Sequence, residues 1–581
     1  MQQKIVRVRK VTRRVKSKGA VLVLFGLIAG VGFMSTPTQN AAAQMKADEA
    51  EDLALVPGAP SWAEKASSNV WLRFTKRWQR LEAEAAKMSA KGTAPGDLPI
   101  AAAVTFGAHV FNKDTSALPQ NETTVAIDPK SALRIVGGYN DYRGLLAPNN
   151  FTGWSISTDG GATTAKDGQI PPAVVLGVPA PSQGDPAVAF DKNGNLFMGS
   201  FHFPSSQNPN GVTIARSPAA GALTGVFSAA CTGGSDVDCW PVRRVVRADA
   251  CTSATGFFHD KPWIAVDNSS SVATGSVYIV WTRFGCASSN FSSAIVIAKC
   301  TNNLVTCTAP VVLESTPGTG GARDFVQLSH LAISPVNGKV YTTWGKRSGT
   351  SASNEQVAVR LRVITPSALA TSVGTLGLLR TVQTELLPIP FGTFPYPAFY
   401  RTATYPHVAV KGARAIIVWD RRSVANIIGS FFFNSDILAK FTDNDGVIFS
   451  LPQTVSVALG PQYQPSICVD NTSGTIGVAY FSHQIDPVFT HRQDVYIATS
   501  ATGAAPYTPL RVTATSNDTE ADLRLSDVFI GDYIEVACRG GVGLVHYTAN
   551  YVAKPTSIFT GGSPALLVRQ QDTFLGKVTL P

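Results

Sequence analysis

Short apolar runs return at long, regular intervals along most of the chain. Each copy begins with an apolar residue, usually followed by alanine, and the copies lie at 125–128, 188–191, 264–267, 331–334, 408–411, 467–470 and, more weakly, 534–537. Within 11 to 17 residues of each start, a second run reaches an aromatic residue: Tyr139, Phe201, Trp281, Trp344, Trp419, Tyr480 and Tyr547. A third run follows in six copies. The pattern predicts a repeated unit of three or four short strands.

Units of this length and strand content are typical of an all-β protein, the β-propeller, in which radial repetition leaves few exposed sheet edges. Seven copies predict seven blades, and six blades is the alternative because the seventh copy is weak. A β-helix is a second alternative, but its rungs would be shorter. The stretch 104–112, ahead of the first copy, is predicted to supply the outer strand that closes the last blade.

The N-terminal part differs from the repeats. Residues 1–43 carry eight Lys or Arg and no acid, followed by the apolar run 20–34 and an Ala-Ala-Ala site at 41–43. This composition predicts a secretory signal peptide, with an uncleaved anchor as the alternative and no stable membrane span after cleavage. Without it the chain has 41 basic and 39 acidic residues, which removes the electrostatic support for a nucleic-acid partner.

Residues 44–97 are predicted to form a short helical segment ahead of the propeller at 98–581. Trp71, Phe74, Trp78 and Leu81 fall at helical spacing and would share one apolar face. Such a helix either lies on the main domain or belongs to a pro-segment or linker.

Eight cysteines follow the signal, an even number that favours an oxidising compartment, extracellular or periplasmic. The short spacing within two cysteine pairs predicts two disulfides that each close a local loop. The other two pairs are less constrained, since eight cysteines allow 105 connectivities. The predicted pairs are Cys231–Cys239, Cys300–Cys307, Cys251–Cys286 and Cys468–Cys538.

The stretch SISTDGGATT at 155–164 resembles the Asp box of sialidases, through Ser157, Asp159, Gly161 and Thr163. With the stretches QGDPAVAFDKNGNLF, DKPWIAVD and FIGDYIEVA, it makes residues 100–581 similar to the secreted sialidase-like (BNR-repeat) propellers. The resemblance implies fold more strongly than activity, because propellers host hydrolases, lyases and binding proteins. The stretch itself is predicted to form the turn between third and fourth strands, away from any catalytic mouth, where its side chains bond their own backbone.

Candidate chemistry gathers on the opposite face, where first strands start and second strands end around the funnel mouth. First-strand candidates are Glu122, Asp185, Asp260, His330, His407 and Asp532, and second-strand candidates are Asp141, Arg143, Arg283, Arg347, Asp420 and Arg421. A structural Ca²⁺ held by Glu122, Asp532 and the neighbouring acids is one hypothesis. Four separate acids that each bond backbone N–H groups is the other. No other cofactor is expected.

The sialidase resemblance implies an arginine clamp for a sugar carboxylate, an Asp acid and a Tyr nucleophile. Candidates for the clamp are Arg143, Arg283, Arg347 and Arg421, with Asp141, Asp420 and His407 as further ligand-binding residues. Asp185 or Asp260 is the candidate acid, and Tyr533 the candidate nucleophile, although no Glu obviously partners it.

Two functions remain open from the sequence. The first is a secreted, monomeric glycoside hydrolase of the exo-sialidase kind, or a lyase, that acts on acidic sugars of extracellular glycans or glycoproteins. The second is a non-catalytic binding or scaffold propeller. Arginines that converge on one point would favour the enzyme, and arginines that pair outward with Asp141 and Asp420 would favour the binding protein.

Overall fold

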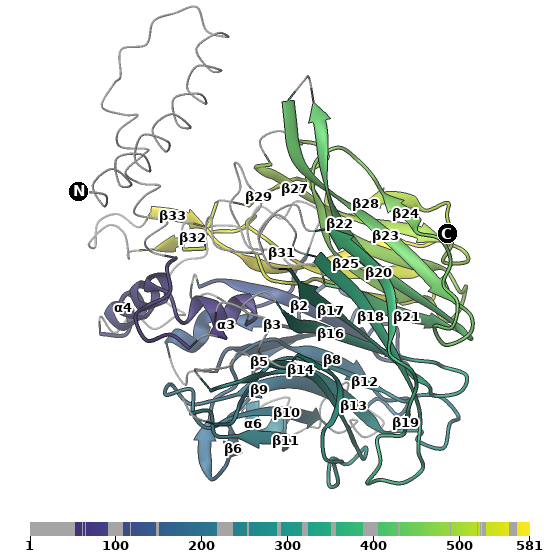
Figure 1. The fold of residues 1–581 in the computed structure, drawn as a ribbon. Helices are drawn as coiled ribbons and strands as arrows, with labels where there is room; N and C mark the ends of the chain where they lie inside the picture. The colour runs from purple at the N-terminus through teal and green to yellow at the C-terminus, as the bar shows by residue number, and fades with distance from the viewer. Residues whose placement is uncertain are drawn as a thin grey trace, which may run out of the picture. The chain divides into compact units, whose positions relative to one another are not determined.

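The computed structural model describes residues 53–90 and 109–581, with gaps in these ranges of which 218–235, 317–323, 350–355, 387–404 and 557–565 are the longest. The predicted signal at 1–43 and Cys231 lie outside the described residues. Residues 55–581 form one compact unit, and within it the sheets dominate (Figure 1).

Seven antiparallel sheets correspond to the seven sequence repeats. Blade 1 comprises β2 (Gln120–Ile127), β3 (Ile135–Asp141), β4 (Thr152–Ser157) and β5 (Lys166–Gln169). Blade 2 comprises β8 (Ala187–Phe190), β9 (Leu196–His202), β10 (Asn210–Ser217) and β11 (Val242–Asp249). Blade 3 comprises β12 (Phe257–Val266), β13 (Val277–Gly285), β14 (Ser293–Cys300) and β15 (Val311–Thr316). Blade 4 comprises β16 (Phe325–Ile333), β17 (Val340–Ser348), β18 (Gln356–Thr365), β19 (Thr375–Leu376) and β20 (Arg380–Leu386).

The remaining three blades follow the same order. Blade 5 comprises β21 (His407–Lys411), β22 (Arg414–Ile427), β23 (Ser430–Thr442) and β24 (Gln453–Ser456). Blade 6 comprises β25 (Gln462–Val469), β26 (Ile476–Ser482), β27 (Arg492–Ser500), β28 (Thr508–Arg511) and β29 (Asn517–Asp518). Blade 7 comprises β30 (Glu535–Arg539), β31 (Val542–Ala549), β34 (Asp572–Thr579) and β1 (His109–Val110). Two small hairpins lie outside the blades: β6 (Ala173–Val175) with β7 (Val178–Ala180), and β32 (Ala553–Thr556) with β33 (Leu566–Arg569).

The inner strands form a closed ring. In chain order, β2, β8, β12, β16, β21, β25 and β30 each contact the next, and β30 contacts β2. The ring is locked by β1, which pairs with β34 so that Val110 lies opposite Phe574. The predictions of seven blades and of a closing strand from the stretch before the first repeat are confirmed.

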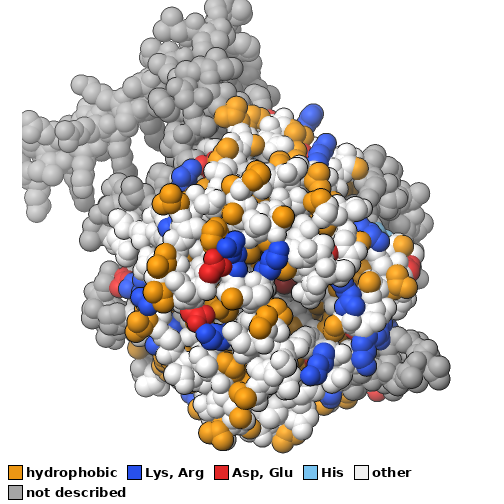
Figure 2. All heavy atoms as spheres, turned by 90° about the vertical axis from the view of Figure 1, so that its right-hand side faces the viewer, with side chains coloured by type: hydrophobic (Ala, Val, Ile, Leu, Met, Phe, Trp, Pro, Cys, Tyr) orange, Lys and Arg blue, Asp and Glu red, His pale blue; other side chains and the backbone are white. Residues whose placement is uncertain are grey.

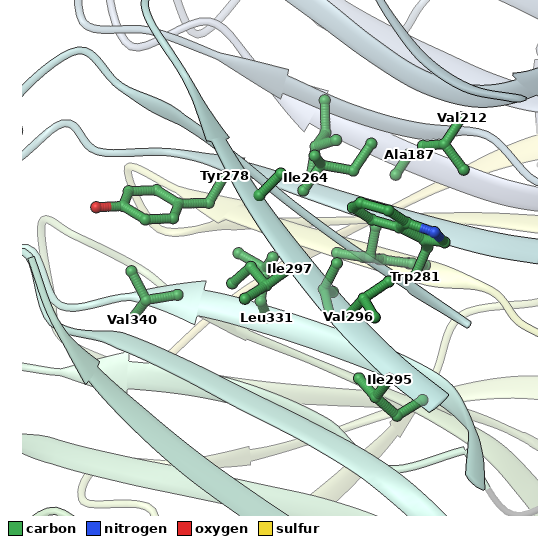
Figure 3. Packing of buried hydrophobic residues seen from close by; sticks show 14 of the residues in the cluster. Ala187, Val212, Ile264, Tyr278, Trp281, Ile295, Val296, Ile297, Leu331 and Val340 are labelled. Atoms are coloured by element: carbon green, nitrogen blue, oxygen red, sulfur yellow. The ribbon is translucent and has the colours of Figure 1, made fainter. Parts of the chain in front are cut away.

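The core lies between the blades, where the predicted aromatic of every second strand is at most 1% exposed. Figure 3 shows one such layer, with Trp281 of blade 3 directed toward Ala187 and Val212 of blade 2. Two of the indoles also make polar contacts with the preceding blade, since Trp344 Nε1–H donates to Glu314 at 2.7 Å and Trp419 Nε1–H donates to Glu385 at 3.2 Å. Each aromatic therefore serves as a wedge between neighbouring sheets.

Three of the predicted disulfides form: Cys251–Cys286, Cys300–Cys307 and Cys468–Cys538. The first ties the start of blade 3 to the end of β13, and the last joins the inner strands of blades 6 and 7. The Cys231–Cys239 pair stays a prediction, because Cys231 is outside the described residues.

The described helices are short, apart from one. They are α3 (Ser68–Leu72), α4 (Lys76–Ala90), α6 (Asp236–Cys239) and the 3₁₀ turn η2 (Tyr142–Leu145). The sequence of α4 is rich in Lys, Arg, Glu, Ala and Leu, which favour helix. It contacts η2 of blade 1 and is drawn in purple in Figure 1. Within the part of the chain that the structure describes, no helix is both long and apolar enough to span a bilayer.

Candidate functional site

A backbone feature at the start of the inner strands builds the site. Three residues before the first apolar position of the repeat, six of the seven blades turn into the left-handed region, with φ from 48° to 97°, at Glu122, Asp185, Lys261, Leu328, Gln464 and Gly531. In four blades the pairing of inner and second strand shifts register there. A side chain other than glycine in this region costs roughly 1–2 kcal/mol. Strain of this kind is typical of functional sites, which it preorganises.

Four carboxyl groups and one ammonium group meet where blades 1, 2, 3 and 7 begin. Glu122, Asp185, Asp260, Asp532 and Lys261 are each at most 1% exposed. Burial raises the pKa of Glu122 well above its usual range, and the charge of Asp185 raises it further. Burial, and then the charge of Asp185, raise the pKa of Asp260 to about 8. Burial therefore favours the protonated form of Asp260 at neutral pH.

Asp185 is held by its backbone. Its N–H donates to Asn140 Oδ1 at 2.8 Å, and the same Asn140 donates from Nδ2 to Glu122 at 2.7 Å. Neither carboxylate oxygen of Asp185 accepts a bond from an N–H or hydroxyl group of the described residues, and the carboxyl group of Glu122 is the acid that reaches it. A buried carboxylate with so few partners is costly, and such groups mark candidate active sites.

Lys261 supplies the positive charge of this cluster. Its Nζ lies 2.9 Å from the centroid of the Tyr533 ring and 5.2 Å from that of Tyr405, which are cation–π positions. The hydroxyl of Tyr533 donates to the carbonyl of Pro186 at 3.0 Å. Tyr533, the predicted nucleophile, thus presents its ring to Lys261 and its oxygen to a carbonyl that cannot take a proton.

Two buried histidines pack together beside Trp263. The rings of His330 and His407 stack with centroids 4.1 Å apart, and Trp263 packs against both. Burial lowers the pKa of His330 to about 3 and that of His407 well below its usual value. His330 Nδ1 accepts from the N–H of Val408, whereas neither ring nitrogen of His407 has a hydrogen-bond partner among the described residues. His407 is therefore a buried, neutral polar side chain.

The four candidate arginines sit on blades 1, 3, 4 and 5, and the partners that follow lie in the same blade as each arginine. Arg143 pairs with Asp141 at 2.6 Å and with Asp167 at 3.1 Å. Arg421 pairs with Asp436 at 2.8 Å rather than with its neighbour Asp420. Arg283 stacks on Phe257 and Arg347 on Phe325, at 4.3 Å and 5.5 Å from the ring centroids. These contacts give no support to an arginine clamp, and Arg143 adopts the pairing that favours a binding protein.

The hypothesis of a bound cation meets a different arrangement. No group of three or more His, Cys, Asp or Glu side chains among the described residues is placed to hold a metal ion. The charge of Lys261 lowers the pKa of Glu122 and of Asp260. The structural Ca²⁺ stays a prediction.

The SISTDGGATT turn lies between β4 and β5, at the end of blade 1 remote from Glu122. Asp159 accepts from the hydroxyl of Ser157 at 2.7 Å and from the hydroxyl and N–H of Thr163 at 2.6 Å and 2.9 Å. The N–H of Gly161, at φ 88°, donates to Ser157 Oγ. The turn is closed by its own side chains, as the sequence predicts.

A segment from the N-terminal part lies directly on the carboxyl cluster. The N–H and hydroxyl of Ser67 donate to the two carboxylate oxygens of Asp260 at 2.8 Å and 2.9 Å. On the face drawn in Figure 2, basic side chains are spread over the surface and the acids near its centre lie against basic neighbours.

Sequence reasoning missed Lys261, Tyr405 and Ser67. Lys261 occupies the same position in its repeat as Glu122 and Asp185 do in theirs. An alignment of the repeats that began three residues before the first apolar position would therefore have found it. The contact of Ser67 joins residues 193 positions apart and leaves no periodic signal.

Comparisons with known proteins concern the fold. Neither a protein-family model nor a curated protein matches the chain. Among solved structures, the phage phi92 endosialidase is 8% identical, with 82% of this chain and 70% of that one covered and a TM-score of 0.40. An α-L-arabinanase of Penicillium chrysogenum, complexed with arabinobiose, is 10% identical over 70% of this chain and 98% of its own, with a TM-score of 0.39. A Hadza microbial sialidase is 11% identical over 78% and 75%, with a TM-score of 0.37.

Proposed function

We propose that this propeller is a glycoside hydrolase that acts on a glycan at the mouth of its channel, with Asp260 as the general acid. The observation that carries the proposal is the pKa of Asp260, raised to about 8 by burial and by the charge of Asp185. Glycoside hydrolysis requires one protonated carboxyl group as the acid and a second carboxyl group close to it, and Asp185 is the neighbour that raises the pKa of Asp260.

Glycoside hydrolysis needs two carboxyl groups of the protein that act on the same sugar. Asp260 would give its proton to the leaving-group oxygen, and Asp185 would act on the anomeric carbon, directly or through water. Glu122 and Lys261 would hold Asp185 in place, since Glu122 shares Asn140 with it and Lys261 balances its charge. Tyr533 supports Lys261 through its ring and takes no part in bond formation.

The mouth favours a neutral sugar over the acidic one that the sialidase resemblance implies. Arg143 and Arg421 are engaged with carboxylates of their own blades. Around Asp260 the propeller instead presents aromatic faces, among them Phe203 and Phe258. Such faces stack well on the apolar side of a neutral pyranose or furanose.

A hydrolysis screen tests the proposal. The purified chain, before and after limited proteolysis, is incubated with matched panels of neutral and acidic glycosides. Asp260→Asn and Asp185→Asn are expected to lower kcat at least 100-fold on any substrate found, whereas Asp443→Asn, at an exposed ion pair with Arg414, leaves it unchanged. Hydrolysis that survives both mouth substitutions would exclude this site.

A glycan-binding or scaffold propeller is the second candidate, because the acids are buried and Ser67 already forms hydrogen bonds with both carboxyl oxygens of Asp260. Retention of the cleaved chain on a glycan array without release of any product would favour it. In either role we propose that the protein is a secreted monomer. The three disulfides suit the oxidising compartment of a secreted protein.

A further inference from the structure

Residues 55–90 belong to the same compact unit as the propeller but add no strand to any blade. The segment folds on itself, through a bridge between Leu55 and Thr75 and the bond from the N–H of Val56 to the carbonyl of Phe74. The ring of blades is closed without it, by β1. Its contacts are therefore additions to a complete propeller.

The first anchor is polar and reaches the proposed acid. Ser67 stands at the N-cap position of α3, yet its hydroxyl makes no cap and donates to Asp260 instead. Its N–H donates to the other oxygen of Asp260, beside Gln327, which donates at 3.1 Å. Two donors from the segment thus fill the positions at which a sugar hydroxyl or leaving oxygen would meet Asp260.

The second anchor is aromatic. The indole of Trp62 stacks on Phe258 with ring centroids 4.0 Å apart and an interplanar angle of 16°, and Phe284 lies parallel behind it at 6.3 Å. Phe74 closes the stack edge-on at 5.4 Å. A flat ring on Phe258 next to Asp260 is the position that a sugar ring bound to this mouth would take.

The third anchor is Arg73. Its guanidinium lies 4.3 Å from the ring centroid of Phe151 and 5.3 Å from that of Phe203, and it donates to the side chain and carbonyl of Gln183. Burial lowers its pKa to about 10, and interactions with Tyr142, with Glu82 and, least of the three, with Asp185 partly offset that effect. Arg73 thereby brings a positive charge toward the carboxyl cluster.

We infer that residues 55–90 are a built-in inhibitor, which occupies the substrate position of the mouth until it is displaced. To call this the substrate position rests on the proposed function. Its contacts reproduce what a ligand would offer: donors to Asp260, a ring stacked on Phe258, and a group against Gln183. The sequence 91–108, KGTAPGDLPIAAAVTFGA, joins the segment to β1 and contains the Gly, Pro and Ala typical of a linker.

The test uses the full chain with a recognition sequence for a site-specific protease inserted between Gly96 and Asp97. Carboxyl groups are labelled with a carbodiimide and glycine ethyl ester, before and after cleavage, and located by mass spectrometry. Trp62→Ala with Arg73→Ala weakens the hold of the severed segment. Gln79→Ala, at an exposed position of α4, is the matched control.

Cleavage of the Trp62→Ala, Arg73→Ala chain should raise the labelling rate of Asp260 at least tenfold, whereas the uncut chain with wild-type anchors stays protected. Asp494, buried in blade 6, should stay unlabelled throughout. Labelling of Asp260 at the same rate before and after cleavage would overturn the inference. Simultaneous labelling of Asp494 would also overturn it, because the segment would then be needed to keep the propeller folded.

Hydrolysis is measured on the same samples and separates the two proposals. A tenfold or larger rise in activity that follows the labelling of Asp260 supports both. Release of Asp260 without hydrolysis of any glycoside supports the inhibitory fit of the segment but refutes the proposed enzyme. The Gln79→Ala chain should behave as the chain with wild-type anchors in every arm.

Discussion

Replacement of Asp260 by asparagine tests the electrostatics of the mouth independently of any substrate. An asparagine has nearly the shape of the protonated acid, and its Oδ1 can accept the N–H of Ser67. The hydroxyl of Ser67, which donates to the carboxylate, turns to accept from Nδ2, as it would from the protonated acid. The two proteins should therefore differ through the charge of residue 260 alone.

The direction in which folding stability changes with pH follows from the raised pKa of Asp260. The folded chain keeps this proton up to about pH 8, whereas the unfolded chain loses it near pH 4. Folding therefore takes up a proton between these values, and the stabilising contribution of Asp260 is complete below about pH 4 and is lost as the pH rises toward 8. Each pH unit in this window costs about 1.4 kcal/mol of the free energy of unfolding.

Denaturant unfolding of the wild-type and Asp260→Asn chains from pH 5 to pH 7 measures the effect. Relative to the wild type, the variant should gain about 3 kcal/mol across this interval. Titrating groups that do not interact with Asp260 are common to both chains and cancel in the difference. Parallel stability curves would show that Asp260 titrates normally, and the argument for a general acid at this position would fail.

Two further predictions concern the scaffold. Trp344→Phe should lower the free energy of unfolding by about 1–2 kcal/mol, because Glu314 loses an indole donor between blades 3 and 4 while the aromatic wedge is kept; unchanged denaturant midpoints would show that the bond contributes nothing. Asp159→Ala should lower stability by about 1 kcal/mol or less, since it opens an exposed turn, and it should leave carbodiimide labelling of Asp260 unaltered, in contrast to a role for this turn at the mouth.

The propeller could be predicted because its physics is periodic. Apolar inner strands and an aromatic at the end of each second strand recur in every blade, since every blade must bury the same faces against its neighbours. The closing strand followed from the same count, as a ring without it would leave one blade an outer strand short. Cys251 and Cys286 lie at adjacent ends of one blade, but sequence spacing left their pairing less constrained than that of Cys300 and Cys307.

The site could be predicted only in part. Glu122, Asp185 and Asp260 were found as strand-start acids, but the left-handed backbone at Glu122, Asp185 and Lys261 was not predicted, because residues other than glycine adopt it uncommonly. Lys261 was missed because the repeats were compared only from their first apolar position. The docking of Ser67 on Asp260 depends on the folded surface of three blades, and no local pattern encodes it.

The closing pair of β1 with β34 sets an order of events during synthesis. The last blade needs residues 572–579, so the ring cannot be completed until nearly the whole polypeptide has been made. Residues 55–90 are made before every blade and are on hand when blades 1 to 3 assemble around Asp260. A newly made molecule would therefore reach its native state with residues 55–90 already bound over Asp260. The timing of its first turnover would then be decided by whatever removes the segment rather than by folding.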